Sequence, residues 1–591
     1  MTLASRPPGL GLAAGRLGLT GLAFALASGL VACEPEGAPR ARPGPASPAA
    51  PPPSLAPPAP PPAAAPAEPG ALRLTPAMIG GHIRFLADDL LEGRAPGTRG
   101  SELAVKYIAA AMEAAGLEPA GENGTYFQKV PLVGIKAEPP ARVRVRAPKG
   151  GAARELEVIK DLVVMSGVQR PKGNLAEAEV VFVGYGIVAP EYQWDDYKDV
   201  DVKGKVVLVM NNDPAGDPKL FGGKARLRYG RWDYKYEQAA KKGAAGVVII
   251  HTDESAAYPW QVVVSSNARE RFELPAGDEP RLEAKMWATE AASRAIAKLG
   301  GHDLDRLRAA AEARDFRPTP LGVRLGFAFA NQVRKVESAN VVGRRRGRDP
   351  ALAGEAVVFT AHHDHLGVGA PNQQGDAIYN GALDNASGVA AILAIAGAAA
   401  RQPPTRRSQL FVAVAAEEQG LLGSAYYCEH PTVPPGKMAA NFNVDSVNRH
   451  GKTSDVSFLG YGKSSLDALV VEAARAQGRE VRGDAYPEKG GFYRSDQYNF
   501  AKIGVPAVYL RGGPTFVGRP PGWGAERQKA YEAHDYHQPS DQYDDTWDLS
   551  GAVEDAELLW AVARRVADAP ELPAWKPGDE FEAARKASLG R

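Results

Sequence analysis

The first regular pattern of apolar positions begins near residue 76 and has the period of an α-helix. Thr75 and Pro76 supply a cap residue and a first helical residue, and the apolar positions that follow fall on one helical face. These positions are Ile79, Ile83, Leu86 and Leu90. A second helix is predicted over residues 101–115, because Gly116 follows as a stop signal. Between the two helices, LEGRAPGTRGS is expected to form a loop.

From about residue 156 the pattern changes to short apolar runs, which predict strands. AEVVFVGYGI, GKVVLVM and AGVVIIHT are such runs, and YEQAAKKG before the last one is expected to be a helix. This β-rich region ends near FRPTPLG and holds no clustered set of His, Asp and Glu. We therefore interpret it as a lid or recognition module.

After this region the chain alternates strand and helix. EAVVFTA, QLFVAVAAEE, NFNVDS and VPAVYL are predicted strands, and GALDNASGVAAILAIAGAAA runs from a polar turn into an Ala-rich helix. Such alternation is typical of an α/β fold, in which a mostly parallel, mixed sheet is flanked by helices on both faces.

Candidate ligands for a metal ion follow several of these strands. They are His362, Asp364, Asp384, Glu417, Glu418 and Asp445. Because parallel strands present functional residues beyond their carboxyl ends, we expect these side chains to meet. Imidazole with carboxylates suits zinc, and several carboxylates with few histidines suit two ions rather than one structural ion. The pattern predicts half of a two-metal hydrolase site.

Five motifs carry a family resemblance. AHHDHLG, GALDNASG, AAEEQGLLGS, NVDSV and YHQPSD, in this order, resemble the secreted di-zinc aminopeptidase family, whose relatives include the glutamate carboxypeptidases and the transferrin receptor. The resemblance implies a zinc exopeptidase fold and two Zn²⁺ ions. It implies that one ion is bound by His362, Asp384 and Asp445, and the other by Asp384, Glu418 and His537.

The same resemblance implies catalytic roles. Glu417 would be the general base, Asp364 would orient His362, and the Tyr536 hydroxyl would help to stabilise the oxyanion. His363 and His365 have no ligand role in the family pattern, so we expect them to be structural or to lie behind the ligands. Where members often read S-D-H, this chain has Ser495-Asp496-Gln497, which leaves the pocket contribution there open.

The β-rich region also resembles a known module. YGIVAPEYQWDDYKDVDVKGKVVLV looks like the protease-associated domain that is often inserted in this family. We therefore predict a first part of the peptidase domain over residues 71–154, a protease-associated insert over 155–315, and the main catalytic part over 316–591. The length of 591 residues agrees with more than one hydrophobic core.

The N-terminus is predicted to export and anchor the protein. Arg6 and Arg16 precede an apolar run too short to span a bilayer comfortably, and Leu30-Val31-Ala32-Cys33 resembles a bacterial lipobox. This resemblance implies a lipoprotein signal peptide over 1–33, with lipid on Cys33. Residues 34–70, rich in Pro and Ala, would form a disordered linker. We expect a lipid-anchored protein of the cell envelope, on its periplasmic or cell-surface side.

Charge and cysteine content bear on nucleic-acid binding, membrane contact and disulfide formation. Lys plus Arg (70) nearly equals Asp plus Glu (69), so no strong field draws the protein to nucleic acid, and the lipid is its only expected membrane contact. Cys428 would have no partner for a disulfide if Cys33 is lipidated.

The expected activity is zinc-dependent hydrolysis of N-terminal residues from peptides. A glutamate-type carboxypeptidase remains an alternative, for which Arg494 and Arg511 would hold the terminal carboxylate. A glutaminyl cyclase, which uses one zinc, and a non-catalytic, receptor-like binding module are the others. The pattern does not decide the side-chain preference or the oligomeric state.

Overall fold

The computed structural model describes residues 72–147, 151–217 and 219–590. These residues belong to one compact unit. The predicted signal peptide and the predicted Pro/Ala-rich linker lie outside the described residues.

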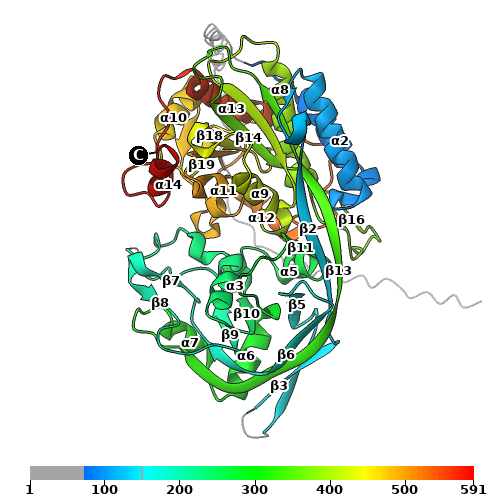
Figure 1. Cartoon of the computed structure of the whole chain (residues 1–591), viewed down its shortest axis with the longest axis vertical. Helices are drawn as coiled ribbons and strands as arrows, with labels where there is room; N and C mark the ends of the chain where they lie inside the picture. The colour runs from blue at the N-terminus through cyan, green and yellow to red at the C-terminus, as the bar shows by residue number, and fades with distance from the viewer. Residues whose placement is uncertain (1–71, 148–150, 218, 591) are drawn as a thin grey trace, which may run out of the picture. The chain divides into compact units, whose positions relative to one another are not determined.

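The C-terminal part of the chain forms a mixed sheet with a parallel centre (Figure 1). In spatial order its strands are the end of β13 (Thr319–Arg345), β17 (Ser408–Val414), β14 (Ala356–His362), β18 (Met438–Asn443), β21 (Ala507–Gly512), β19 (Asp455–Leu459) and β20 (Glu480–Arg482). The four strands β17, β14, β18 and β21 run parallel to one another. Every residue of β14, β17 and β18 is buried, which explains their continuous apolar runs. The predicted fold class is confirmed.

Helices cover both faces of this sheet. On one face a single apolar core joins the sheet to α1 (Pro76–Leu86), α2 (Arg99–Ala114), α8 (Ser387–Ala399), α10 (Leu466–Ala476) and α13 (Ser550–Asp568). On the other face α9 (Leu422–Glu429) and α11 (Gln497–Lys502) pack over a second core. Helix α8 is apolar enough to cross a membrane, but 94% of its window Ala382–Ala399 is buried inside the protein, as expected for a core helix.

The first two helices differ slightly from their prediction. The side chain of Thr75 accepts a hydrogen bond from the Met78 backbone N–H, and Pro76 begins α1, as the sequence indicates. Helix α1 ends at Leu86, however, and Leu90 lies in a following 3₁₀ turn with 79% of its surface exposed. The prediction that Leu90 shares the buried face is wrong, because the chain leaves the helix before that position.

The β-rich region forms a second sheet segment with its own helices. β6 (Lys172–Phe182), β9 (Val206–Met210), β10 (Gly246–His251) and β12 (Ala284–Thr289) run parallel, and β5 (Leu162–Ser166) pairs antiparallel with β12. Helices α3 (Trp232–Lys241) and α5 (Trp260–Asn267) pack on one face, and α6 (Glu290–Leu299) and α7 (Leu304–Ala310) on the other. The three apolar runs of the sequence correspond to β6, β9 and β10.

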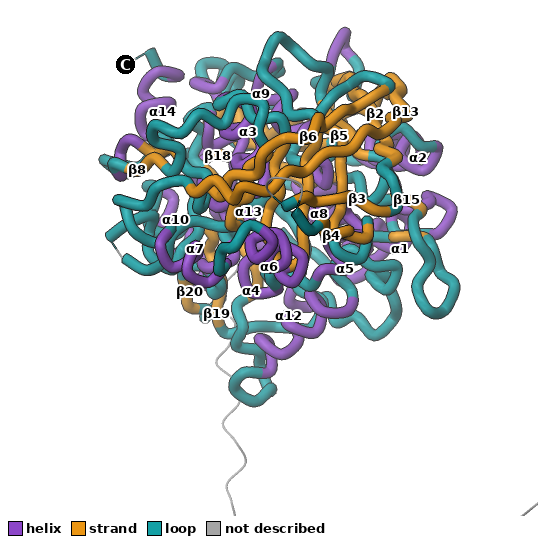
Figure 2. Tube along the Cα trace, turned by 90° about the horizontal axis from the view of Figure 1, so that it is seen from below, coloured by secondary structure: helices purple, strands orange, loops and turns teal. Residues whose placement is uncertain are grey.

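Two long strands connect this region with the catalytic sheet. The first half of β13 pairs with β6, its middle pairs with β2 (Phe127–Glu138), and its end pairs with β17. The paired strands β6, β13 and β2 can be followed in Figure 2. Near the catalytic part, the short strand β11 (Arg271–Glu273) adds to β2. Strand β13 pairs with strands of both parts, so the sheet shows no break between them. The predicted limits of the insert, residues 155–315, therefore stay predictions.

Shorter elements complete the fold. They are β1 (Glu118–Pro119), β3 (Arg142–Arg146), β4 (Ala153–Glu157), β7 (Val188–Ala189), β8 (Trp194–Asp195), β15 (Gly367–Val368), β16 (Ile378–Tyr379), β20 as above, α4 (Asp253–Ala256), α12 (Trp523–His534) and α14 (Glu582–Ser588).

Candidate metal centre and active site

The five predicted metal ligands lie together at the carboxyl edge of the parallel strands. His362 ends β14, and Glu418 and Asp445 follow β17 and β18. Asp384 lies in the irregular turn Ala382–Ala386 before α8, and His537 follows α12. Adjacent parallel strands end at the same edge, and this topology brings the side chains together.

Asp384 lies between the two histidines. Its Oδ1 is 3.3 Å from His362 Nε2, and its Oδ2 is 3.3 Å from His537 Nε2. Asp445 Oδ1 lies 3.6 Å from His362 Nε2, and Glu418 Oε2 lies 3.1 Å from His537 Nε2. The side chains therefore form two sets that share the Asp384 carboxylate. One set is His362, Asp384 and Asp445, and the other is Asp384, Glu418 and His537.

These side chains fit zinc. Two ligands at about 2.0–2.2 Å from one tetrahedral ion are about 3.3–3.6 Å apart, which is close to the spacing of these donor atoms. Both imidazole Nε2 atoms are buried and, within the part of the chain that the structure describes, face the carboxylate oxygens above without the alignment of a hydrogen bond. Buried polar atoms usually have a partner, so these two nitrogens are well suited to bind a metal ion.

The charges of these side chains also favour the binding of a cation. Burial would raise the pKa of Asp384, but His362 and His537 hold it well below its usual range. Burial would lower the pKa of His537, but Glu418 and Asp384 raise it to about 9. The carboxylates outnumber the histidines at this edge, so the cluster attracts cations.

Glu417 is placed for proton transfer beside these ligands. Its Oε2 lies 3.9 Å from His362 Nε2. Burial, together with the negative charges of Glu418, Asp496 and Asp445, raises its pKa well above the usual range. Glu417 and Glu418 occupy one 3₁₀ turn between Ala416, with φ of 52°, and Leu421, with φ of 63°. This left-handed backbone is unusual for residues other than glycine and is often found at functional sites.

Asp364 lies behind both His362 and Glu417. Its backbone oxygen is 3.2 Å from His362 Nδ1, whereas its carboxylate Oδ1 is 3.8 Å away. The carboxylate accepts a hydrogen bond of 2.9 Å from the Glu417 backbone N–H. Burial raises the pKa of Asp364 to about 7. The role proposed for the Asp364 carboxylate in orienting His362 stays a prediction, and its direct contact is with Glu417.

His365 and Asp541, which are neither predicted ligands nor predicted catalytic residues, contact predicted ligands. His365 Nδ1 lies 2.7 Å from Glu418 Oε1, in agreement with the expected position behind the ligands. The Asp541 carboxylate accepts hydrogen bonds from the backbone N–H groups of Leu383 (3.0 Å) and Asp384 (3.1 Å). Asp541 belongs to the quoted motif YHQPSD, which was the available signal for it.

Arg94 was missed because its segment was expected to be only a loop. Its guanidinium is buried and donates hydrogen bonds to the backbone oxygens of His363 (2.9 Å) and Gly381 (3.0 Å), which lie near the predicted ligands His362 and Asp384. No feature of the sequence separates this arginine from the others.

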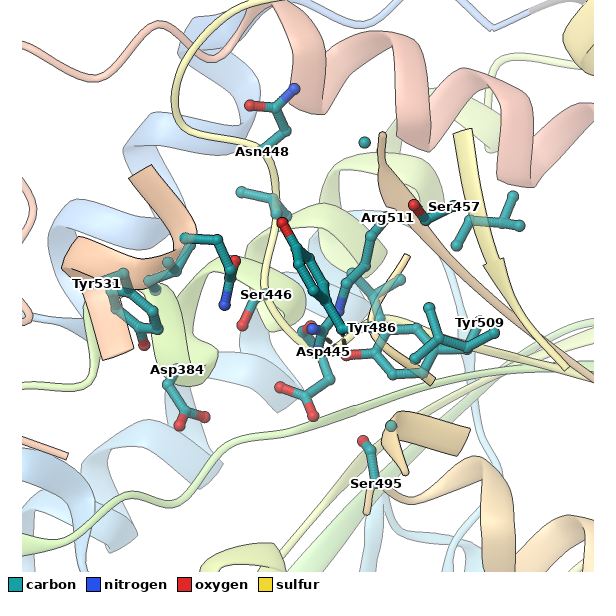
Figure 3. Close-up of a pocket in the computed structure, with 18 of the residues that line it drawn as sticks. Asp384, Asp445, Ser446, Asn448, Ser457, Tyr486, Ser495, Tyr509, Arg511 and Tyr531 are labelled. Carbon is teal, nitrogen blue, oxygen red and sulfur yellow. Dashed lines mark hydrogen bonds between the residues drawn. The ribbon is translucent and has the colours of Figure 1, made fainter. Parts of the chain in front are cut away.

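A cavity of about 280 Å³ opens beside Asp384 and Asp445. Figure 3 shows Tyr486, Tyr509, Arg511 and Tyr531 around it. Tyr509 donates a hydrogen bond of 2.7 Å to the backbone oxygen of Asp445, and Arg511 Nε donates to the Tyr509 hydroxyl over 2.8 Å. This wall of the cavity therefore supports Asp445.

The altered S-D-Q motif contributes through Ser495, which lines the cavity. Gln497 is buried, and its side chain accepts a hydrogen bond of 2.8 Å from Asn443 and donates one of 2.6 Å to the Phe492 backbone oxygen. The residue that departs from the family pattern thus supports the strand β18 from behind.

Tyr536 lies against His537, with ring centroids 3.9 Å apart, and lines the cavity. Burial raises the pKa of its hydroxyl well above the usual range, so this hydroxyl remains a hydrogen-bond donor. A second cavity of about 120 Å³ lies beside it and is lined by Tyr258 and Ser266 of the insert and by Arg494 of the catalytic part.

Comparison with known proteins identifies the class. Residues 340–561 match the model of peptidase family M28, and residues 172–278 match that of the PA domain. The main catalytic part is therefore similar to peptidase family M28 and the insert to a PA domain, in agreement with both parts of the family resemblance.

Individual relatives are aminopeptidases. The chain is 27% identical over 219 residues to "Aminopeptidase YwaD" of Bacillus subtilis (strain 168), which is 36% of this chain and 41% of that protein. It thus spans about two fifths of that curated relative. A solved aminopeptidase from Aneurinibacillus sp. strain AM-1 is 20% identical, with a TM-score of 0.49, over 86% of this chain and 97% of that one. The zinc aminopeptidase BSAP of Bacillus subtilis is 18% identical, with a TM-score of 0.44, over 86% and 98%.

Proposed function

We propose that this chain is a zinc-dependent aminopeptidase, which hydrolyses the N-terminal residue from peptides. The observation that carries the proposal is the position of Asp384, whose two oxygens face His362 and His537 beside a cavity that also contains Glu417. The aminopeptidase activity of the relative named above supports the same assignment.

The residues proposed to hold two zinc ions are those of the sequence prediction. His362, Asp384 and Asp445 would bind one ion, and Asp384, Glu418 and His537 the other. When bound, zinc supplies Lewis acidity, which polarises a carbonyl group and makes water a better nucleophile near neutral pH.

Glu417 would act as the general acid and base. A buried carboxylate with a raised pKa can take the proton of the attacking water and return it to the leaving amine. The hydrogen bond from its backbone N–H to Asp364 holds the Glu417 turn in place during this transfer. The hydroxyl of Tyr536 would donate a hydrogen bond to the oxygen on which negative charge develops.

The charge of the site favours a free amino terminus. An ammonium group in the cavity would lie near Glu417 and Asp445, where partial exclusion of water strengthens the attraction between opposite charges. A substrate carboxylate at the same place would be repelled.

The alternatives are less well supported. A glutamate-type carboxypeptidase would use Arg494 or Arg511, which both line the cavity, but Arg511 Nε donates to the Tyr509 hydroxyl over 2.8 Å and Arg494 Nη1 donates to the Lys489 backbone oxygen over 3.4 Å. A glutaminyl cyclase, which uses one zinc ion, would not need a second set of zinc ligands. A receptor-like module would not need a complete set of ligands. Zinc analysis together with a panel of free and N-blocked peptides tests the proposal. Two zinc ions per chain with turnover of free peptides support it, and an absence of zinc-dependent turnover refutes it.

We also propose that the protein is exported and held at the cell envelope by lipid on Cys33, with residues 34–70 as a spacer. Peptides near the membrane would be its substrates.

A further inference from the structure

The PA insert contacts the side chain of one proposed zinc ligand. Ser266 lies in the last turn of α5, 271 residues before His537 in the chain. Its Oγ is 2.7 Å from His537 Nδ1, the ring nitrogen that faces away from Asp384 and Glu418. This distance is that of a well-formed hydrogen bond.

A neighbouring arginine of the insert, Arg271, links Ser266 to the turn that carries Glu418. Arg271, the first residue of β11, donates hydrogen bonds from Nη1 to the backbone oxygens of Ser266 (3.1 Å) and Glu418 (2.9 Å). The Phe272 backbone N–H donates to the Gln419 side chain over 3.2 Å. One short segment of the insert therefore contacts both His537 and the turn that carries Glu418.

The contact of Ser266 with His537 would orient the imidazole ring for zinc binding. An imidazole that binds a metal ion through Nε2 carries its hydrogen on Nδ1, and the acceptor of that N–H fixes the tautomer and the orientation of the ring. With zinc on Nε2, Ser266 Oγ would be the acceptor at His537. The backbone of His537 has a left-handed φ of 57°, which is unusual for this residue type, so a support from outside its own loop is of particular use.

The other histidine is supported differently. His362 Nδ1 faces the backbone oxygen of Asp364, two residues away in the same loop, at 3.2 Å. The orientation of His362 therefore comes from the catalytic part alone. Within the described residues, the Ser266 hydroxyl contacts His537, whereas the hydrogen-bond partner of His362 Nδ1 is the backbone oxygen of Asp364.

We propose that Ser266 is a positioning residue for the zinc ion bound by Asp384, Glu418 and His537. Arg271 would hold Ser266 and the Glu418 turn at a fixed distance from each other. The insert, whose sequence pattern predicts a lid or recognition module, is then also part of the metal site. The inference rests on the proposed zinc-binding function.

Zinc affinity of the full chain tests the proposal without relying on turnover. We expect Ser266→Ala to weaken the binding of one of two zinc ions by roughly 10- to 100-fold in competition with a chromophoric chelator, as is usual when the partner of a metal-bound histidine is lost. Ser266→Thr, which keeps a hydroxyl, should restore most of the affinity. Ser293→Ala is the matched control, because Ser293 is a buried serine of α6 in the same insert and its Oγ donates to the Thr289 backbone oxygen over 3.0 Å.

The outcomes separate this inference from the proposed function. Loss of affinity for one ion in Ser266→Ala, with the metal-free protein melting at the wild-type temperature, supports it. Wild-type affinity for both ions in Ser266→Ala, or an equal loss at both sites, overturns the positioning role while the two-zinc function stands. A wild-type chain that binds no zinc overturns the proposed function and this inference together.

Discussion

The carboxylate of Asp364 accepts a hydrogen bond of 2.9 Å from the backbone N–H of Glu417, although the two residues are 53 positions apart. Asp364 follows β14 and Glu417 follows β17, and these strands are parallel neighbours. The hydrogen bond therefore ties together the ends of two strands, one carrying His362 and the other carrying the proposed base. It keeps the Glu417 turn beside the proposed zinc ligands.

Replacing the proposed base should separate catalysis from metal binding. Glu417→Gln should retain both zinc ions but lower kcat by about 10²- to 10⁴-fold, because the amide can no longer accept the proton of water. Steady-state kinetics and zinc analysis of the same preparation measure both effects. Glu418→Gln, one residue further, is the control and should lose zinc affinity. A Glu417→Gln enzyme that works near the wild-type rate would remove Glu417 from the mechanism.

Gly381 is predicted to tolerate no side chain. It has φ of +56°, and a Cβ there would lie 2.3 Å from the Asp384 backbone oxygen and 2.4 Å from His365 Cγ. Gly381→Ala should displace Asp384 and so lower zinc affinity and turnover together. Gly397→Ala, in α8, is the control, because its Cβ would meet no atom within 4 Å. Gly397→Ala should leave stability unchanged or raise it by up to about 1 kcal/mol. Equal zinc affinity of the two variants would contradict the prediction.

Glu273 in β11 should stabilise the insert in a pH-dependent way. Burial raises the pKa of this carboxyl, but Lys285 and Arg281, each 2.6 Å away, outweigh burial and lower the pKa from 4.5 to about 2. Between these values the unfolded chain binds more protons than the folded one, so the stabilisation is present above pH 4.5 and is lost as the pH falls towards 2.

Glu273→Gln should therefore lower the free energy of unfolding by about 1–3 kcal/mol at pH 7. The difference from wild type should shrink as the pH drops below 4.5. Urea midpoints measured across this range test the expectation, with Glu279→Gln as an exposed control that should have little effect. A difference that grows in acid would show that the sign is wrong.

The lipid anchor is predicted to affect location alone. Cys33→Ser should release the protein from the membrane fraction, because the acylated thiol is lost, while kcat/KM of the folded part stays the same. Cell fractionation and incorporation of labelled fatty acid provide the measurement. If wild-type protein takes up no fatty acid, the lipobox interpretation fails.

The sequence predicts most of the sheet and the position of the cluster, for a physical reason. The apolar runs of β14, β17 and β18 are buried on both faces, and parallel strands must end at one edge, so the polar residues after each strand are expected to converge. His537 follows a helix, and only the family resemblance pointed to it.

Contacts made through the tertiary fold were beyond the sequence. Ser266 and Arg94 lie in segments without a local pattern of ligands, and their partners are distant in the chain. The face assigned to Leu90 failed for a local reason, because α1 ends at Leu86 and the helical period continued in the sequence without a helix to follow it.

The central claim is that a free amino terminus is recognised beside two zinc ions. The most direct measurement compares one peptide with a free N-terminus and the same peptide N-acetylated, both assayed with zinc present. Because acetylation removes the positive charge that Glu417 and Asp445 would attract, we expect release of the first residue from the free peptide and loss of most of the rate with the acetylated one. Equal rates on the two peptides, or release of residues only from the carboxyl end, would contradict the aminopeptidase assignment.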